Sequence, residues 1–225
     1  MEIRLADEIA KMPDLSPDLL ASRLKAGDFF EQRIEAKLLG CTDAVRRVTF
    51  NCEGIQSSSA SFLDELFFID VFTLNFRHGN SVSVLTNLSD EFYFNLRVAV
   101  EGKKKLIENA RKNGIYYRTK DEARAEHPEG VPNHLVCQIG SPYILCEYQN
   151  GIEVLGFSEG EKQKILLERM IRGGERITAA QLAAQEEKLN NSAANNRLNR
   201  LYEKRLIFRK PMTEKAPEKY EYFFV

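Results

Sequence analysis

The residues with the clearest potential for chemistry lie near the C-terminus, in the stretch SAANNRLNRLYEKRLI that begins at residue 192. Its apolar residues recur at helical spacing and define one stripe: Ala194, Leu198, Leu201 and Leu206. Asparagine and arginine, which stand outside this stripe, can each form two hydrogen bonds to one base edge, of adenine and guanine respectively. The helix therefore predicts a DNA-contacting face with these candidates: Ser192, Asn195, Asn196, Arg197, Asn199 and Arg200.

Positive charge is concentrated around this stretch. Residues 192–215 include seven basic and two acidic side chains, whereas the whole chain has a formal net charge of −1. A local excess of positive charge is what a phosphate-binding surface needs, because binding energy comes from neutralising phosphates and releasing their counterions. The further basic residues that we assign to this surface are Lys204, Arg209, Lys210 and Lys215.

A second candidate site is the serine run in GIQSSSASFLDELFF, residues 54–68. Serine hydroxyls before an apolar segment can satisfy the free amides of a helix start, and Ser61 with Asp64 or Glu65 resembles a capping box. A helix start with several hydroxyls can also receive a phosphate or an acidic group of a partner. Capping, partner contact and phosphorylation therefore stay open for this set: Ser57, Ser58, Ser59, Ser61, Asp64 and Glu65.

Motifs typical of enzymes are not found in the sequence. His78, His127 and His134 have no Cys, Asp or Glu at a metal-binding spacing such as HExxH, and there is no P-loop, GxGxxG or GxSxG motif. The four cysteines are widely spaced without a CxxC pair, which favours reduced core thiols over a disulfide or metal site. We expect no catalytic residues, no metal and no cofactor.

The composition is that of an ordinary soluble globular protein, with 43% hydrophobic and 29% charged residues in a chain of 225. No run of about 20 apolar residues predicts a membrane span. The first residues, MEIRLADEIAKMPD, lack the apolar centre of a secretory signal. We therefore expect a cytoplasmic protein without a membrane partner.

Strand-like and helix-like segments alternate in the first half of the chain. Strands are expected within 1–9, 44–55 and 79–88, and helices within 16–40, 61–76 and 89–114, the last capped by Ser89. This alternation predicts a small α/β layer. From Asn113 to Asn133 the sequence is charged and contains Pro and Gly, which predicts a domain boundary. Its part from Arg118 to Pro132 has no apolar periodicity, so few contacts are expected to cross it. A β-hairpin, or an extension of one domain's sheet, is expected over 134–157.

The last third has a different layout. We expect three helices, over 158–174, 177–190 and 192–207, with caps at Ser158, Thr178 and Ser192. Two aromatic strands around a charged tip follow over 208–225. Three helices followed by a basic hairpin are the layout of a winged helix-turn-helix.

This last third also resembles the winged-helix families of bacterial transcription regulators, through the pattern S-x-x-x-x-x-L-x-x-L-x-x-x-x-L-I over 192–207. The resemblance covers roughly residues 158–225 and implies double-stranded DNA as a partner. One position departs from the pattern: the residue before the final Leu-Ile, commonly glycine in these families, is Arg205.

The segment VTFNCEGIQSSSASFLDELFF, residues 48–68, resembles the STAS-like domains of unknown function of bacteria. Their core has a strand, a Gly-hydrophobic turn and then Ser-Phe-x-Asp-Glu at a helix start, here Ser61 to Glu65. In the broader STAS family a partner kinase phosphorylates a serine or threonine there, which follows an Asp and precedes a Gly. In this chain no Asp stands ahead of the serines, and Phe62 stands near the position of the Gly. The resemblance, over about 15–110, implies a histidine-kinase-like ATPase as a partner.

The sequence as a whole predicts an α/β protein in three parts. These are a STAS-like domain over 1–117, a linker and β-hairpin connector over 118–157, and a winged helix-turn-helix domain over 158–225. The expected function is a bacterial or phage-type DNA-binding transcriptional regulator, whose N-terminal part senses a signal or forms a homodimer. The alternative is a partner-switch adaptor that binds a histidine-kinase-like ATPase or another protein through both domains, without DNA.

Overall fold

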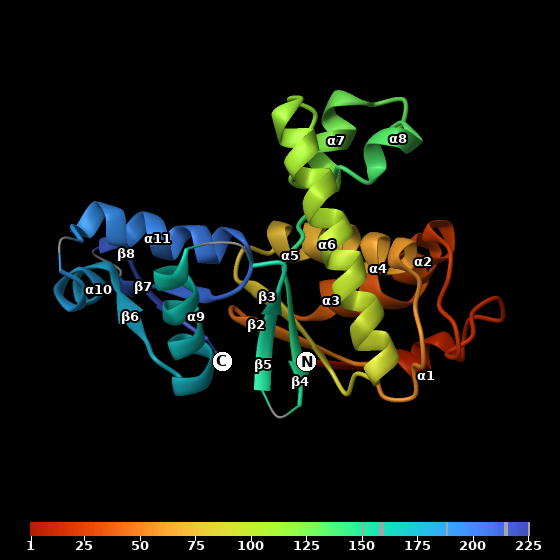
Figure 1. Cartoon of the computed structure of the whole chain (residues 1–225), viewed down its shortest axis with the longest axis horizontal. Helices are drawn as coiled ribbons and strands as arrows, with labels where there is room; N and C mark the ends of the chain where they lie inside the picture. The colour runs from red at the N-terminus through yellow and green to blue at the C-terminus, as the bar shows by residue number, and fades with distance from the viewer. Residues whose placement is uncertain (150, 158–159, 188, 214–215, 225) are drawn as a thin grey trace.

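The structure is a computed structural model that describes residues 1–149, 151–157, 160–187, 189–213 and 216–224. Helices surround two β-sheets (Figure 1). The larger sheet has five strands in the order β1-β2-β3-β4-β5, and the smaller has three in the order β6-β8-β7. The predicted α/β class is confirmed at this level.

The five-stranded sheet is formed mostly from the first half of the chain. Its strands are β1 (Glu2–Arg4), β2 (Arg46–Asn51), β3 (Ser81–Thr86), β4 (Ile144–Tyr148) and β5 (Gly151–Leu155). The first four run parallel and β5 is antiparallel to β4. The hairpin predicted over 134–157 therefore extends this sheet, which was one of its two expected roles.

Helices connect the parallel strands, as parallel pairing requires. Those before β4 are α1 (Leu5–Ile9), α2 (Arg23–Phe29), the π-helix η1 (Phe30–Ile34), α3 (Glu35–Gly40), α4 (Ala60–Leu63), the π-helix η2 (Asp64–Val71), α5 (Phe72–Arg77), α6 (Asp90–Lys112), α7 (Lys120–Glu126) and α8 (Asn133–Val136). Fully buried phenylalanines, among them Phe29, Phe50, Phe62 and Phe92, fill the core between these helices and the sheet. The predicted cap Ser89 is confirmed, because its side chain accepts a hydrogen bond from the amide of Phe92.

The first long helix begins later than the sequence predicts. It starts at Arg23 rather than near Ser16. Residue 20 instead forms a short parallel bridge with Ser58, in which the Leu20 amide donates to the Ser57 carbonyl over 3.0 Å. Leu20 is 1% exposed, so its side chain is buried from an extended backbone. A buried Leu20 also fits the apolar stripe of a helix, which is why the sequence predicted a helix here.

The segment 118–132 is packed against the protein, and the expectation that few contacts cross it is wrong. Helix α7 begins at a Thr119 cap, and Ala123 in its middle is wholly buried. Ala123 belongs to a small apolar cluster with Ile69 of η2 and Ile139. Lys120 and Asp121 form ion pairs with residues of η2 and α5. The apolar side chains of this cluster are few and far apart in the sequence, so they produce no periodic pattern that would predict the packing.

The C-terminal part has the three predicted helices followed by the two predicted strands, but Ile177 and Thr178 form a short strand where the start of a helix was expected. It consists of α9 (Glu161–Gly173), β6 (Ile177–Thr178), α10 (Ala179–Gln185), α11 (Asn191–Glu203), β7 (Phe208–Thr213) and β8 (Ala216–Phe223). Thr178 caps α10 in a capping box with Gln181, as expected. The expected cap of α11 is wrong, because Asn190 rather than Ser192 accepts from the amide of Ala193. The expected cap Ser158 lies outside the described residues.

A second core joins the C-terminal part to the five-stranded sheet. Val82 and Val84 of β3 pack in one cluster with Leu198 and Leu206, whereas Leu85 belongs to the helix-covered core. Neighbouring residues of a strand point to opposite faces, so the C-terminal part covers the face that the α2–α6 helices leave open. The domain limits at 117 and 157 stay a prediction, but the described residues between 160 and 224 do not pack as an isolated module.

Candidate nucleic-acid interface

Helix α11 has one buried and one exposed face. Ala194, Leu198 and Leu201 are completely buried, which confirms the predicted apolar stripe. The exposed side chains Ser192, Asn196 and Arg200 follow one another at a spacing of four residues. Residues four apart lie above one another on a helix, so these three form a continuous polar stripe. We call this set the α11 stripe.

Two of the predicted base-contacting residues face the protein instead of solvent. The hydroxyl of the buried Tyr222 donates to Oδ1 of Asn199 over 2.6 Å and lies 3.3 Å from Oδ1 of Asn195. Arg209 Nη1 donates to the same Asn199 oxygen over 3.0 Å. These bonds hold α11 against β8, and the burial of the Tyr222 hydroxyl raises its pKa. Asn195 and Asn199 therefore position the helix rather than face a ligand.

Two of the predicted arginines are also engaged within the protein. Arg197 Nη1 lies 2.6 Å from Glu186 Oε1, and both side chains are only about one-fifth exposed. Arg209 lies between the rings of Tyr202 and Tyr220, 4.0 and 4.1 Å from their centroids. Both are half-buried. These contacts hold the two guanidinium groups against the protein, and their assignment to DNA stays a prediction.

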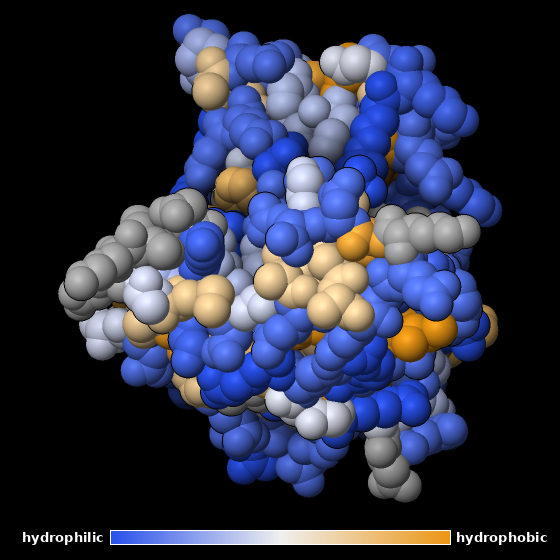
Figure 2. All heavy atoms as spheres, turned by 90° about the vertical axis from the view of Figure 1, so that its left-hand side faces the viewer, coloured by the Kyte–Doolittle hydropathy of each residue, from blue (hydrophilic) through white to orange (hydrophobic). Residues whose placement is uncertain are grey.

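The lysines assigned to this surface occupy different places. Lys204 lies 5.1 Å from the ring centroid of Tyr143, at the end of α11. Lys210 of β7 is exposed, and its Nζ lies 3.1 Å from Glu221 Oε2 on β8. Lys215 lies outside the described residues. Hydrophilic side chains cover most of the face that carries the C-terminal part, with small apolar patches between them (Figure 2).

Arg205 stands where glycine was expected, and α11 still ends before it, at Glu203. Its φ of 58° is the left-handed conformation that glycine commonly supplies after a helix. The guanidinium donates to the carbonyl oxygens of Gly79, in the turn before β3, and of Phe76, in the last turn of α5, and lies 4.7 Å from the Phe76 ring centroid. Arg205 thus compensates a strained backbone with contacts that fix α11 relative to the five-stranded sheet.

The serine run forms a helix start, as capping predicts, but not with the expected residue. Ser59 accepts from the amide of Phe62 over 3.2 Å, and Ser61 Oγ lies 3.1 Å from Ser59 Oγ. Ser57 and Ser58 are buried, with hydrogen bonds to Asn95 and to the Leu20 carbonyl. Within this serine run Ser61 alone is exposed.

Asp64 and Glu65 are buried, so neither forms a capping box or is presented to a partner. They are 7% and 5% exposed, and both pair with Arg23 of α2. Lys103 of α6 lies 2.6 Å from Asp64 Oδ1, and Lys120 of α7 lies 2.9 Å from Glu65 Oε1. Three cations from three helices thus surround two adjacent carboxylates. No local pattern in the sequence predicts this network, because its partners are 39 or more positions apart in the chain.

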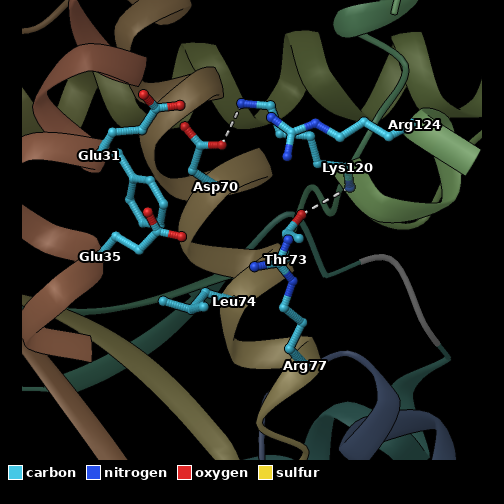
Figure 3. A pocket seen from close by; sticks show the side chains of 9 residues that line it. Glu31, Glu35, Asp70, Thr73, Leu74, Arg77, Lys120 and Arg124 are labelled. Atoms are coloured by element: carbon cyan, nitrogen blue, oxygen red, sulfur yellow. Dashed lines mark hydrogen bonds and ion pairs between the residues drawn. The ribbon is translucent and has the colours of Figure 1, made fainter. Parts of the chain in front are cut away.

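The same network continues into a cavity of about 120 Å³ beside Asp70 (Figure 3). Lys120 Nζ lies 2.7 Å from Asp70 Oδ1, and Glu31 and Arg124 also line the space. Burial raises the pKa of Asp70 to about 7, and the nearby Glu65 carboxylate adds to this shift. With as many basic as acidic side chains lining it, the cavity favours neither an anion nor a cation.

Among the described residues, no group of three or more His, Cys, Asp or Glu side chains is placed to hold a metal ion. In the same part of the chain, no helix combines the length and the apolar character needed to cross a membrane. No family model, curated protein or solved structure matches the chain in the comparisons with known proteins. The arrangement of the side chains is therefore the basis for proposing a function.

Proposed function

We propose that the protein is a DNA-binding transcriptional regulator that reads duplex DNA with α11. In this proposal residues 158–225 act as a winged helix-turn-helix, with α11 as the recognition helix and the β7–β8 hairpin as the wing. The order helix, short strand, two helices and hairpin supports this assignment. So does the short connection between α10 and α11, which the Glu186–Arg197 ion pair spans.

The α11 stripe is the observation that carries the proposal. Ser192, Asn196 and Arg200 are exposed, while the opposite face of the same helix is completely buried. A helix of 13 residues that is anchored in this way presents hydrogen-bonding side chains at a fixed angle. The major groove is about 12 Å wide and admits one helix, and asparagine and arginine suit adenine and guanine. Of the five Asn and Arg side chains predicted to contact DNA from this helix, the proposal keeps Asn196 and Arg200 as the base-contacting residues.

We expect the double variant Asn196→Ala, Arg200→Gln to bind duplex DNA at least about 10-fold more weakly than the wild type. Each good base contact contributes about 1–3 kcal/mol. The probe is a genomic fragment from around the protein's own gene that the wild type shifts in a gel. Both side chains are exposed, so the unfolding temperature should stay nearly unchanged.

The matched control is Arg172→Gln, which removes an exposed charge from α9 in the same part of the chain. It should bind the fragment as tightly as the wild type. If the double variant and the control bind equally well, α11 does not read the DNA.

The N-terminal part is proposed as a sensing or dimerisation domain, from the resemblance of residues 48–68 to STAS-like domains. The competing proposal is a partner-switch adaptor that binds a histidine-kinase-like ATPase without DNA. Such an adaptor would use the serine run, where Ser61 is exposed but Ser57 and Ser58 are buried. A wild-type protein that shifts no duplex at low salt would favour this adaptor.

A further inference from the structure

A basic cavity lies where the C-terminal end of α6 meets the end of α11. Its volume is about 260 Å³, and the lining includes Arg111 and Arg118 from one side and Arg200 and Lys204 from the other. Figure 1 shows the C-terminal end of α6, with α7 beside it, standing above the level of α11. The cavity is therefore the inner corner of an L-shaped surface. We call it the basic corner.

The three arginines of the basic corner, Arg111, Arg118 and Arg200, are poorly compensated. One acidic residue, Glu203, lines the cavity beside the four basic ones. Within the described part of the chain, no ion pair is formed by Arg111, Arg118 or Arg200. Charges of one sign along a low-dielectric wall focus the electrostatic field and attract counterions. An anion is therefore the ligand that this corner suits.

Aromatic rings hold the two arginines of the upper wall. Arg111 lies 4.5 Å from the ring centroid of Tyr116, and Arg118 lies 5.4 Å from that of Phe76. A guanidinium that packs on a ring keeps its N–H groups in its own plane, so they remain able to bind an oxyanion. A guanidinium can donate two parallel hydrogen bonds to two oxygens of one phosphate. The basic corner therefore suits a phosphate better than a monatomic anion such as chloride.

The basic corner is continuous with the α11 stripe. Arg200 belongs to both, since it ends the stripe and lines the cavity. From Ser192 to Arg200 the helix rises about 12 Å, at about 1.5 Å per residue. A polyanion that follows the stripe past Arg200 therefore reaches Arg111, near the end of α6, and Arg118, between α6 and α7.

We infer that the basic corner holds a backbone phosphate of the duplex that α11 reads. This rests on the proposed function and adds a DNA contact from α6, outside the residues expected to bind DNA. The contact gives a reason for the packing of the C-terminal part against the sheet. The distance between α11 and Arg111 must stay constant if both are to bind the same duplex. A free phosphorylated compound has the same chemistry and is the competing source.

The test is the double variant Arg111→Gln, Arg118→Gln in the full chain, titrated with duplex DNA at several salt concentrations. One lost phosphate contact should reduce the slope of log K against log salt by about 0.9. The control is Lys105→Gln, Lys112→Gln, which removes two exposed charges of α6 that do not line the corner. Its slope should equal that of the wild type.

Four outcomes are distinguishable. A smaller slope for the arginine variant, with the control unchanged, supports the inference. Equal slopes for wild type, arginine variant and control overturn it while the proposed function survives. A wild type that binds no duplex overturns both. Finally, pyrophosphate can be titrated calorimetrically without DNA: if the arginine variant loses pyrophosphate binding but keeps the wild-type DNA slope, the corner belongs to a free phosphorylated compound.

Discussion

The Lys103→Met variant is expected to lower the free energy of unfolding by about 3 kcal/mol, because breaking a buried ion pair leaves the buried Asp64 carboxylate with Arg23 as its one remaining cation among the described residues. Lys103 is 2% exposed, and its Nζ lies 2.6 Å from Asp64 Oδ1 and donates to the Cys137 carbonyl over 3.0 Å. Burial lowers the pKa of Lys103, and the Asp64 carboxylate opposes that shift. Urea unfolding of the variant and the wild type measures the difference.

The matched control is Lys105→Met on the exposed face of the same helix, which should stay within about 0.5 kcal/mol of the wild type. A double-mutant cycle with Asp64→Asn should give a coupling energy above about 1 kcal/mol, as expected for residues in one network. If Lys103→Met costs no more than Lys105→Met, the network contributes nothing to holding α6 against η2.

The Arg205→Ala variant is expected to lose about 2–4 kcal/mol of stability. It removes two hydrogen bonds to the carbonyl oxygens of Gly79 and Phe76 and the contacts with the Phe76 and Tyr202 rings. The Phe76 carbonyl still accepts from the Gly79 amide, whereas the partly buried Gly79 carbonyl loses the guanidinium, and a carbonyl left without a donor inside a protein costs about 1–3 kcal/mol. The left-handed backbone at this position remains strained with alanine.

Arg205→Gly separates the side chain from the backbone. Glycine adopts a φ of 58° without the steric cost, so this variant should be about 1 kcal/mol more stable than Arg205→Ala. Both should be less stable than the wild type in thermal unfolding. An Arg205→Gly protein that is more stable than the wild type would mean that the guanidinium does not fix α11 to the sheet.

Local patterns in the sequence were sufficient to predict several elements, although α7, α8 and β6 were not predicted. Alternating β-branched residues predicted β2 and β3, and the spacing of Ala194, Leu198 and Leu201 predicted the buried face of α11. The Ser89 cap was predictable because a capping residue acts within three positions of itself. In each case the interaction is local, or depends only on which face is apolar.

Contacts between distant residues decided the rest. Asn199 has the right chemistry to bind a base, but its partner Tyr222 stands 23 positions away and turns it inward. Asp64 has the spacing of a capping residue, but α6 brings Lys103 to it. A polar side chain shows which bonds it can form, whereas its position in the fold determines which bonds it does form. Among the Asn and Arg residues of α11, the exposed ones, Asn196 and Arg200, could be identified only from the structure.

Photocross-linking from position 196 tests the proposed reading of DNA by α11 most directly. A benzophenone side chain in place of Asn196 would stand in the middle of the α11 stripe, and one in place of the exposed Phe94 on α6 serves as the control. With a bound duplex, we predict a cross-link to DNA from position 196 that weakens as salt is raised, and none from position 94. A duplex that binds without cross-linking to position 196, or that cross-links equally from position 94, would contradict the proposal.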